Sequence, residues 1–98
     1  MNEDIIQALK ANHGEKADSM ACFCEVKFIS EDTDWFCYVY ALDPIDCDTI
    51  ECIIPGPRVT QWSLISLLET YNHHGEYVQI DKDFRPMRAC ELFRKLNE

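Results

Sequence analysis

The segment from Trp35 to Leu42 constrains the fold most, because its residues are aromatic, aliphatic or small and none is charged. Side chains of a β-strand point alternately to opposite faces of the sheet, so this strand would carry apolar side chains on both faces. Other parts of the chain must then cover each face. The segment therefore predicts the central strand of a sheet that is packed on both sides.

Two neighbouring segments predict strands that flank this central strand. Residues Ala21 to Ile29 and Thr49 to Ile54 alternate between two sets of side chains with a period of two, which is typical of half-buried strands. The core-facing set of the first segment is Cys22, Cys24, Val26 and Phe28. The connections at residues 30–34 and 43–48 are short and polar, so the three strands are expected to form an antiparallel meander.

Three segments predict helices from their capping residues and apolar periodicity. The first helix follows Asn2 and stops at Asn12-His13-Gly14. The second follows Ser63 and stops at His73-His74-Gly75, and the third starts at Pro86 and runs to Leu96. The apolar stripe of the second helix consists of Leu64, Ile65, Leu67, Leu68 and Tyr71.

Two short strands complete the predicted fold, one at Arg58 to Trp62 and an edge strand at Glu76 to Asp81. The fold class is α+β, a small antiparallel sheet of three to five strands with two to three helices packed on it. The length of 98 residues corresponds to one domain, so residues 1–98 are expected to form a single acidic domain.

The amino terminus and the cysteines indicate the cellular compartment of the protein. Met1 to Ile6 contain no basic segment with a following apolar run, so no secretory signal is expected, and no stretch approaches the roughly 18 apolar residues of a membrane span. We therefore expect a cytoplasmic protein. The six cysteines are expected to be free and mostly buried. Disulfides and a metal site remain alternatives, although only Cys22-x-Cys24 comes near a metal-ligand spacing.

The charge of the chain is strongly negative, with 18 acidic against nine basic side chains and a net charge of −9. Such a charge opposes direct binding to nucleic acid or to an anionic membrane. Residues 25–51 hold eight carboxylates against Lys27 alone, a segment charge of −7. Two interpretations remain open. The carboxylates either keep the turns soluble, or they replace nucleic-acid phosphates in the basic groove of another protein.

The second interpretation selects a set of candidate partner-binding residues. These are Glu31, Asp32, Asp34, Asp43, Asp46, Asp48 and Glu51, with Trp62 as an aromatic anchor. The turns at 30–34 and 43–48 are predicted at opposite ends of the central strand, roughly 25 Å apart at the rise of a β-strand. The binding surface would then be an elongated edge, with Glu25 and Glu51 between its ends.

Other kinds of site find less support in the sequence. Asp43 to Glu51 lacks the ligand spacing and the central glycine of an EF-hand calcium loop. His73 and His74 are adjacent at a helix end and point in different directions. No motif joins a nucleophile to a base, and no glycine loop to cradle a phosphate is present. We expect no cofactor and no bound metal. A magnesium-dependent nuclease built on the carboxylates and a structural or oligomeric adaptor remain alternatives.

A basic segment stands apart from the acidic one. Residues 82–95 have a net charge of +3, so this segment can meet the acidic part of another copy, which permits a homodimer.

Several short motifs occur in a characteristic order. They are Asn12-His13-Gly14, Val26-Lys27-Phe28, Asp34-Trp35, Ala41-Leu42-Asp43-Pro44, Trp62-Ser63-Leu64 and Asp81-x-Asp83-Phe84-x-Pro86. In this order the chain resembles, over most of its length, a family of small uncharacterised domains carried by bacterial plasmids, phages and integrated mobile elements. The resemblance implies a mobile-element origin, and hence the cytoplasm of a bacterial host cell, and it supplies no catalytic residues.

Together the acidic segment and the resemblance predict a non-enzymatic protein that binds another protein. The expected partner is a nucleic-acid-binding defence protein of the host, such as a CRISPR effector or a restriction enzyme, which the acidic surface would block as a nucleic-acid mimic.

Overall fold

The computed structural model describes residues 1–31, 33–73 and 78–98. Its largest element is a five-stranded antiparallel sheet with the strand order β5-β4-β3-β2-β6. The strands are β2 (Val26–Ser30), β3 (Phe36–Leu42), β4 (Thr49–Ile54), β5 (Arg58–Ser63) and β6 (Val78–Ile80). β3 lies in the middle and is buried from Cys37 to Leu42, as its two-sided apolar composition predicted.

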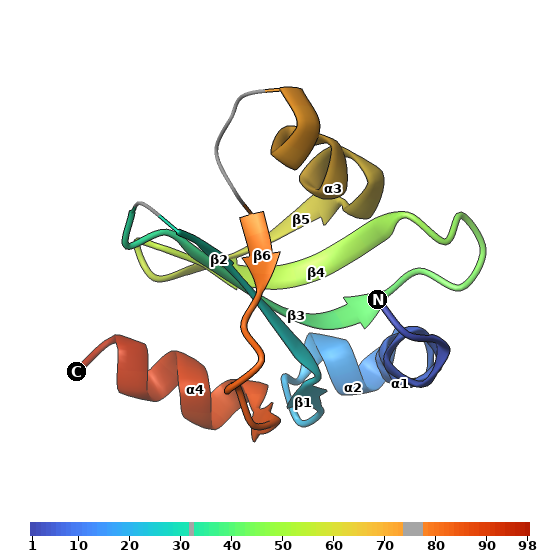
Figure 1. Cartoon of the computed structure of the whole chain (residues 1–98). Coiled ribbons are helices and arrows are strands. Elements are labelled where there is room, and N and C mark those ends of the chain that lie inside the picture. The colour runs from blue at the N-terminus through green and yellow to red at the C-terminus, as the bar shows by residue number, and fades with distance from the viewer. Residues whose placement is uncertain (32, 74–77) are drawn as a thin grey trace.

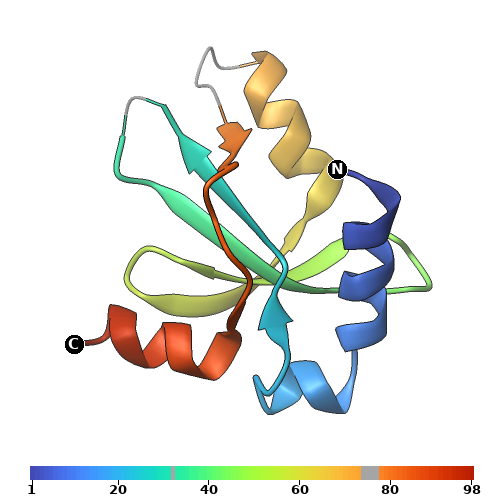
Figure 2. The same ribbon diagram turned by 60° about the horizontal axis from the view of Figure 1, so that its bottom comes forward.

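Helices and a second, two-stranded sheet cover the main sheet. The helices are α1 (Glu3–Asn12), α2 (Glu15–Asp18), α3 (Leu64–His73) and α4 (Ala89–Leu96), and β1 (Phe23–Cys24) pairs with β7 (Met87–Arg88). In Figure 1, α3 lies above the main sheet, whereas α2, α4 and β1 lie below it. Figure 2 places α1 and α4 on opposite sides of the molecule. The predicted α+β class is confirmed. No described helix has the length and apolar character needed to cross a membrane.

The buried side chains form two clusters, one on each face of the sheet. The first, covered by α1 and α3, contains Leu9, Val26, Phe28, Cys37, Val39, Leu42, Ile50, Cys52, Ile54, Leu64 and Leu67. The second, covered by α2, α4 and β1, contains Ala17, Cys22, Cys24, Tyr38, Tyr40, Ala41, Ile53, Ala89 and Leu92. The pairing of β3 with β4 shifts between Val39 and Ala41, which brings both Tyr40 and Ala41 into the second cluster.

The predicted helix starts are confirmed for α1 and α3. The backbone N–H of Ile5 donates to Asn2 Oδ1 at 2.9 Å, so Asn2 caps α1. The N–H of Ser66 donates to Ser63 Oγ at 3.1 Å at the start of α3. The apolar stripe of α3 is only half buried, since Leu64 and Leu67 face the core whereas Ile65 and Leu68 are 56% and 44% exposed. The Tyr71 side chain, His74 and Gly75 lie outside the described residues.

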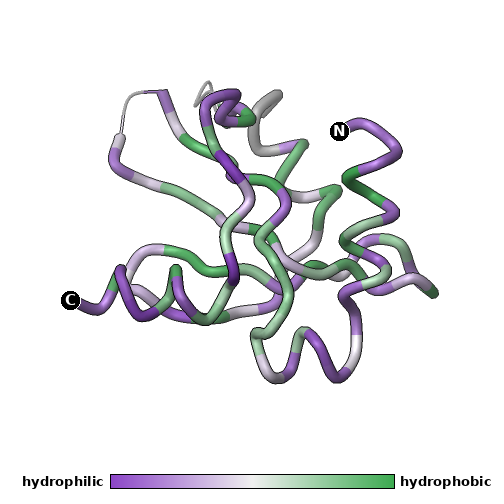
Figure 3. Tube along the Cα trace, turned by 90° about the horizontal axis from the view of Figure 1, so that it is seen from below, coloured by the Kyte–Doolittle hydropathy of each residue, from purple (hydrophilic) through white to green (hydrophobic). Residues whose placement is uncertain are grey.

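α4 is amphipathic, and its start differs from the prediction. Figure 3 shows hydrophilic and hydrophobic colours alternating along this helix. It begins at Ala89 and not at Pro86, because Met87 and Arg88 pair with Cys24 and Phe23 as strand β7. The helix start predicted at Pro86 was therefore wrong by three residues.

The predicted strand from Ala21 to Ile29 is interrupted at Glu25. Cys22 and Cys24 belong to the second core cluster, whereas Val26 and Phe28 belong to the first. All four are buried, as the alternation predicted, but they face different parts of the core. The edge strand expected at residues 76–81 is present as β6, and residues 76 and 77 lie outside the described part of the chain.

Candidate functional site

The two acidic turns lie at opposite ends of β3, as the sequence predicted. One connects β2 to β3 and holds Glu31 and Asp34, while Asp32 lies outside the described residues. The other, residues 43–48, connects β3 to β4 and holds Asp43, Asp46 and Asp48. In Figure 1 these turns extend to opposite sides of the sheet. The candidate residues are therefore divided between two separate places.

The 43–48 turn is held in one conformation by its own carboxylates. Asp43 Oδ1 accepts a hydrogen bond from the N–H of Ile45 at 2.8 Å. Asp46 Oδ1 accepts from the N–H groups of Asp48 at 2.8 Å and Thr49 at 2.9 Å, and its Oδ2 accepts from the Thr49 hydroxyl at 2.6 Å. The bonds from Thr49 and Asp48 favour the ionised carboxylate and lower the pKa of Asp46 below its ordinary value.

Asp48 joins this turn to the start of α3. Its Oδ1 accepts from the N–H of Ile65 at 2.8 Å, and its Oδ2 accepts from the Ser63 hydroxyl at 2.8 Å. Its backbone carbonyl also accepts from the N–H of Leu64 at 2.8 Å. The first N–H groups of a helix have no partner within the helix, and a negative charge is favourable beside them. Asp48 thus fixes the turn against α3.

Ile45 projects from this fixed turn, and the sequence reasoning did not select it. Its side chain is 92% exposed, the largest value among the exposed large apolar side chains described. It lies between Pro44 and the ionised Asp46, and an apolar residue inside a polar turn was the signal available in the sequence. The turn therefore presents an exposed apolar side chain between two acidic residues of the chain, Asp43 and Asp46.

The acidic residues at the other end of β3 have different surroundings. Glu31 is exposed and accepts a hydrogen bond from Gln79 Nε2 at 3.3 Å. Asp34 is exposed and lines a shallow depression with Lys27, Trp35 and Asp81. Lys27 Nζ lies 3.7 Å from Asp81 Oδ2, and this is the only ion pair within the described ranges 1–31, 33–73 and 78–98. One basic side chain, Lys27, thus lies beside the 31–34 turn.

Glu25 and Glu51 are half buried and lie near the end of α1. Burial raises the pKa of both carboxyls above their ordinary values. The nearby Asp18 raises the pKa of Glu51 further, and His13 opposes this, whereas a hydrogen bond from Asn12 partly offsets the shift at Glu25. Half-buried carboxyls are less accessible to a partner than those of the two turns.

Trp62 lies on β5 and contacts a second tryptophan. The rings of Trp62 and Trp35 meet edge to face, with centroids 6.0 Å apart and planes at 76°. The side chain of Trp62 is 38% exposed, so one part of it packs and another part contacts solvent.

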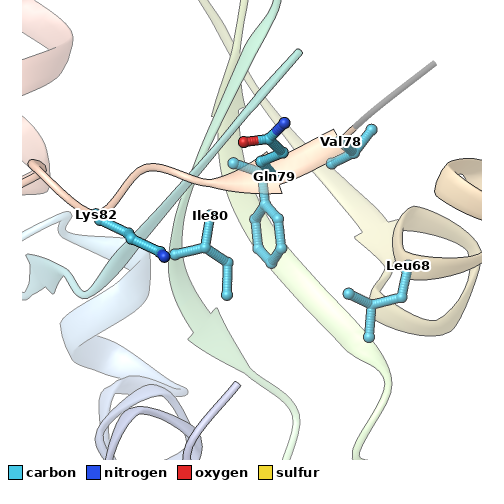
Figure 4. Close-up of a pocket in the computed structure, with 6 residues that line it drawn as sticks. Leu68, Val78, Gln79, Ile80 and Lys82 are labelled. Atoms are coloured by element: carbon cyan, nitrogen blue, oxygen red, sulfur yellow. The ribbon is translucent and has the colours of Figure 1, made fainter. Parts of the chain in front are cut away.

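A separate apolar groove of about 400 Å³ lies between α3 and β6. Figure 4 shows Leu68 on one side of it and Val78, Ile80 and Lys82 on the other, and Phe28 also lines it. None of the candidate residues from the sequence lines this groove.

The thiols divide into buried and exposed groups. Cys22, Cys24, Cys37 and Cys52 are buried, Cys47 and Cys90 are exposed, and all six are free. A hydrogen bond with the Cys52 thiol and burial raise the pKa of Cys37, and burial raises the pKa of Cys24 to about 12. In the part of the chain that the structure describes, no three His, Cys, Asp or Glu side chains come together as a metal site.

Fold and site together define a small α+β domain with an acidic turn that is held by its own hydrogen bonds. Comparisons with protein-family models, with curated proteins and with solved structures found no match to this chain.

Proposed function

We propose that this protein acts without catalysis, by binding the basic groove of a nucleic-acid enzyme and blocking it, and that the 43–48 turn makes the main contact. The observation that carries the proposal is the pairing of a fixed set of carboxylates with the 92% exposed Ile45 in one short turn. An inhibitor from a mobile element directed at a defence nuclease, such as a CRISPR effector or a restriction enzyme, is the concrete form of this function.

The fixed geometry of the turn supports a binding role. Binding costs free energy when flexible side chains and loops become ordered, and a surface that is already ordered avoids much of that cost. Asp43, Asp46 and Asp48 each accept at least one hydrogen bond at 2.8 Å from the backbone or a hydroxyl of their own surroundings. Their negative charges therefore have fixed positions before a partner arrives.

The charge of the turn supports a basic partner. Of the described residues, only Lys27 and Asp81 form an ion pair, and Lys27 lies opposite Tyr38, nearer to the end of β3 that is away from the 43–48 turn. Hydrogen bonds from N–H and O–H groups leave the full negative charge on a carboxylate. The field of these charges thus attracts Lys and Arg side chains, which line grooves that bind nucleic-acid phosphates.

Ile45 adds an apolar contact to the charged contacts of the turn. Exposed ion pairs contribute little binding free energy, whereas an apolar side chain that enters a pocket contributes more. Ile45 is therefore the expected anchor of the turn, and the carboxylates around it set the orientation and speed the encounter. Glu31 and Asp34 would make a second contact only with a groove that extends along β3.

The test is inhibition of DNA cleavage by purified nucleases, an RNA-guided CRISPR effector and a restriction endonuclease, with increasing amounts of the protein. The double variant Asp43→Asn, Asp46→Asn removes two charges and keeps the oxygen that accepts the backbone N–H groups. We expect inhibition that weakens as salt rises, about fivefold weaker binding for each charge removed, and loss of binding in Ile45→Glu.

The matched control is Glu91→Gln, which removes one charge from an exposed residue of α4, outside both acidic turns. It should inhibit as the unmodified protein does. Equal inhibition by all of these variants would show that the 43–48 turn does not make the main contact. If no nuclease in the set is inhibited, the proposed function is wrong.

A further inference from the structure

We infer that β5 is a pairing edge for a second copy of this chain, so that two main sheets join through β5 and its symmetry mate into one antiparallel sheet. This inference is independent of the acidic turn. It rests on the edge of β5, on the order of its side chains and on its charge.

The outer edge of β5 is regular and open. β5 pairs with β4 over six consecutive residue pairs, from Thr49 with Ser63 to Ile54 with Arg58, without a shift in pairing. Within the described residues, the backbone N–H and C=O groups of 58–62 bond to no backbone segment other than β4, and the Gln61 carbonyl accepts one long hydrogen bond, at 3.4 Å, from the neighbouring Thr60 hydroxyl. Alternate residues of an edge strand direct their N–H and C=O groups away from the sheet, where another strand can bond to them.

β5 also lacks the devices by which edge strands avoid pairing. It contains no proline and no bulge, and Arg58 at its first position is its only charged residue. Val59 and Trp62 are 44% and 38% exposed, so apolar side chains lie along this edge. The other edge strand, β6, has only three residues, and Asp81 and Lys82 follow it directly. A long, nearly uncharged edge is the kind that associates.

The side-chain order of β5 suits pairing with itself. Two antiparallel strands related by a two-fold axis keep their faces continuous, so an axis at Thr60 places Thr60 opposite Thr60 and Arg58 opposite Trp62 of the second copy. The guanidinium of Arg58 would then lie beside an indole, which is a favourable cation–π arrangement. This contact would occur twice in the dimer because of the symmetry.

The net negative charge of the chain favours contact between two copies at an edge that carries no carboxylate. Two chains of net charge −9 repel each other, and the repulsion is smallest where no carboxylate lies in the contact. β5 has no carboxylate, and the turn that joins it to β4, residues 55–57, has none either. Added salt should therefore strengthen this dimer, although it should weaken binding by the acidic turn.

Sedimentation velocity of the full chain, from micromolar to near-millimolar concentration, tests the inference. We expect a monomer–dimer equilibrium that shifts towards dimer as salt rises, in the weak range because one strand pair is a small interface. Thr60→Lys and Thr60→Glu each place like charges opposite each other at the axis and should weaken the dimer by about tenfold or more. An equimolar mixture of the two variants should recover a heterodimer.

The matched control is Ile80→Lys on the other edge strand, which should leave the dimer unchanged. Backbone hydrogen exchange of the unmodified protein gives a second measurement, because the amides of β5 should become slower to exchange as concentration rises. A monomer at every concentration overturns the inference, as does a dimer that tolerates both Thr60 variants or shows no added protection in β5. Slowed exchange in β5 only when a foreign peptide is added would assign this edge to another protein.

Discussion

The carboxylate of Asp48 accepts a hydrogen bond at 2.8 Å from the backbone N–H of Ile65, 17 residues further along the chain. The same carboxylate accepts from Ser63, so one side chain connects the turn before β4 to the helix after β5. The acidic turn and α3 therefore depend on each other, and a change at Asp48 acts on both.

Replacing Asp48 with alanine should lower the free energy of unfolding by about 1 to 2 kcal/mol, the usual effect of removing a helix-capping side chain. The N–H of Ile65 and the hydroxyl of Ser63 both lose their acceptor. Urea denaturation followed by circular dichroism measures the change. Asp34→Ala serves as the control, since Asp34 is exposed at the other end of β3, and equal unfolding midpoints of the two variants would contradict the capping role.

Glu51→Gln should stabilise the protein at neutral pH. Burial raises the pKa of Glu51 above its ordinary value of 4.5, so the folded state holds the proton more tightly than the unfolded state does. The stability from this group is complete below the ordinary pKa and is lost as pH rises through the higher folded value. Glutamine carries no charge at any pH, so it avoids this loss.

The gain in Glu51→Gln should therefore shrink as the pH falls below about 4.5, where the glutamate itself becomes protonated. Asp46 has the opposite sign, because its lowered pKa gives stability above the ordinary value that is lost as pH falls through the folded value. Urea midpoints of both proteins between neutral and acidic pH provide the measurement. A gain that is constant over this range would exclude the titration of Glu51 as its cause.

The main sheet was predictable from the sequence because the pattern of apolar and polar residues in a strand reflects which of its side chains are buried. Alternation identified β2 and β4, and the apolar stretch from Trp35 identified β3 as the centre. The same alternation concealed the interruption at Glu25. Cys24 and Val26 are both buried, one in each core cluster, and a pattern of burial does not say which cluster a side chain enters. The start of α4 was missed for a related reason, since the pairing of Met87 with Cys24 is a long-range contact.

The site was only partly accessible from the sequence. The positions of the two acidic turns followed from the strand order, and the separation of Asp34 from Asp46 followed from the length of β3. Short-range bonds such as that from Thr49 to Asp46 are typical of aspartates in turns and were open to prediction. The bond between Asp48 and Ile65 depends on how the sheet places α3, so local sequence did not contain it.

Two of the six thiols should react quickly with a thiol reagent and four should react only after unfolding. Cys47 and Cys90 are exposed, whereas the other four are buried and three of them, Cys22, Cys24 and Cys37, have a raised pKa that disfavours the reactive thiolate. Titration with a chromogenic disulfide in the presence and absence of guanidinium counts each class. Single substitutions Cys47→Ser and Cys90→Ser should each remove one fast equivalent. Four or more fast equivalents in the native protein would contradict the burial of these thiols.

Trp62→Ala should lower the free energy of unfolding by about 1 to 2 kcal/mol, less than a fully buried tryptophan would, because part of the side chain is already in contact with water. The lost contact is the edge-to-face packing against Trp35, with ring centroids 6.0 Å apart. Trp62→Phe keeps an aromatic ring in place and should recover part of the loss.

Ile45→Ala is the matched control, because a 92% exposed side chain contributes little to folding and its removal should change the stability by less than about 0.5 kcal/mol. Since the chain has two tryptophans, the fluorescence of Trp35 in the Trp62→Ala variant reports its surroundings separately and should shift to longer wavelength as the ring becomes more exposed. An unchanged stability and an unchanged Trp35 emission in this variant would show that Trp62 is not part of the packing and would leave the whole of its side chain available to a partner.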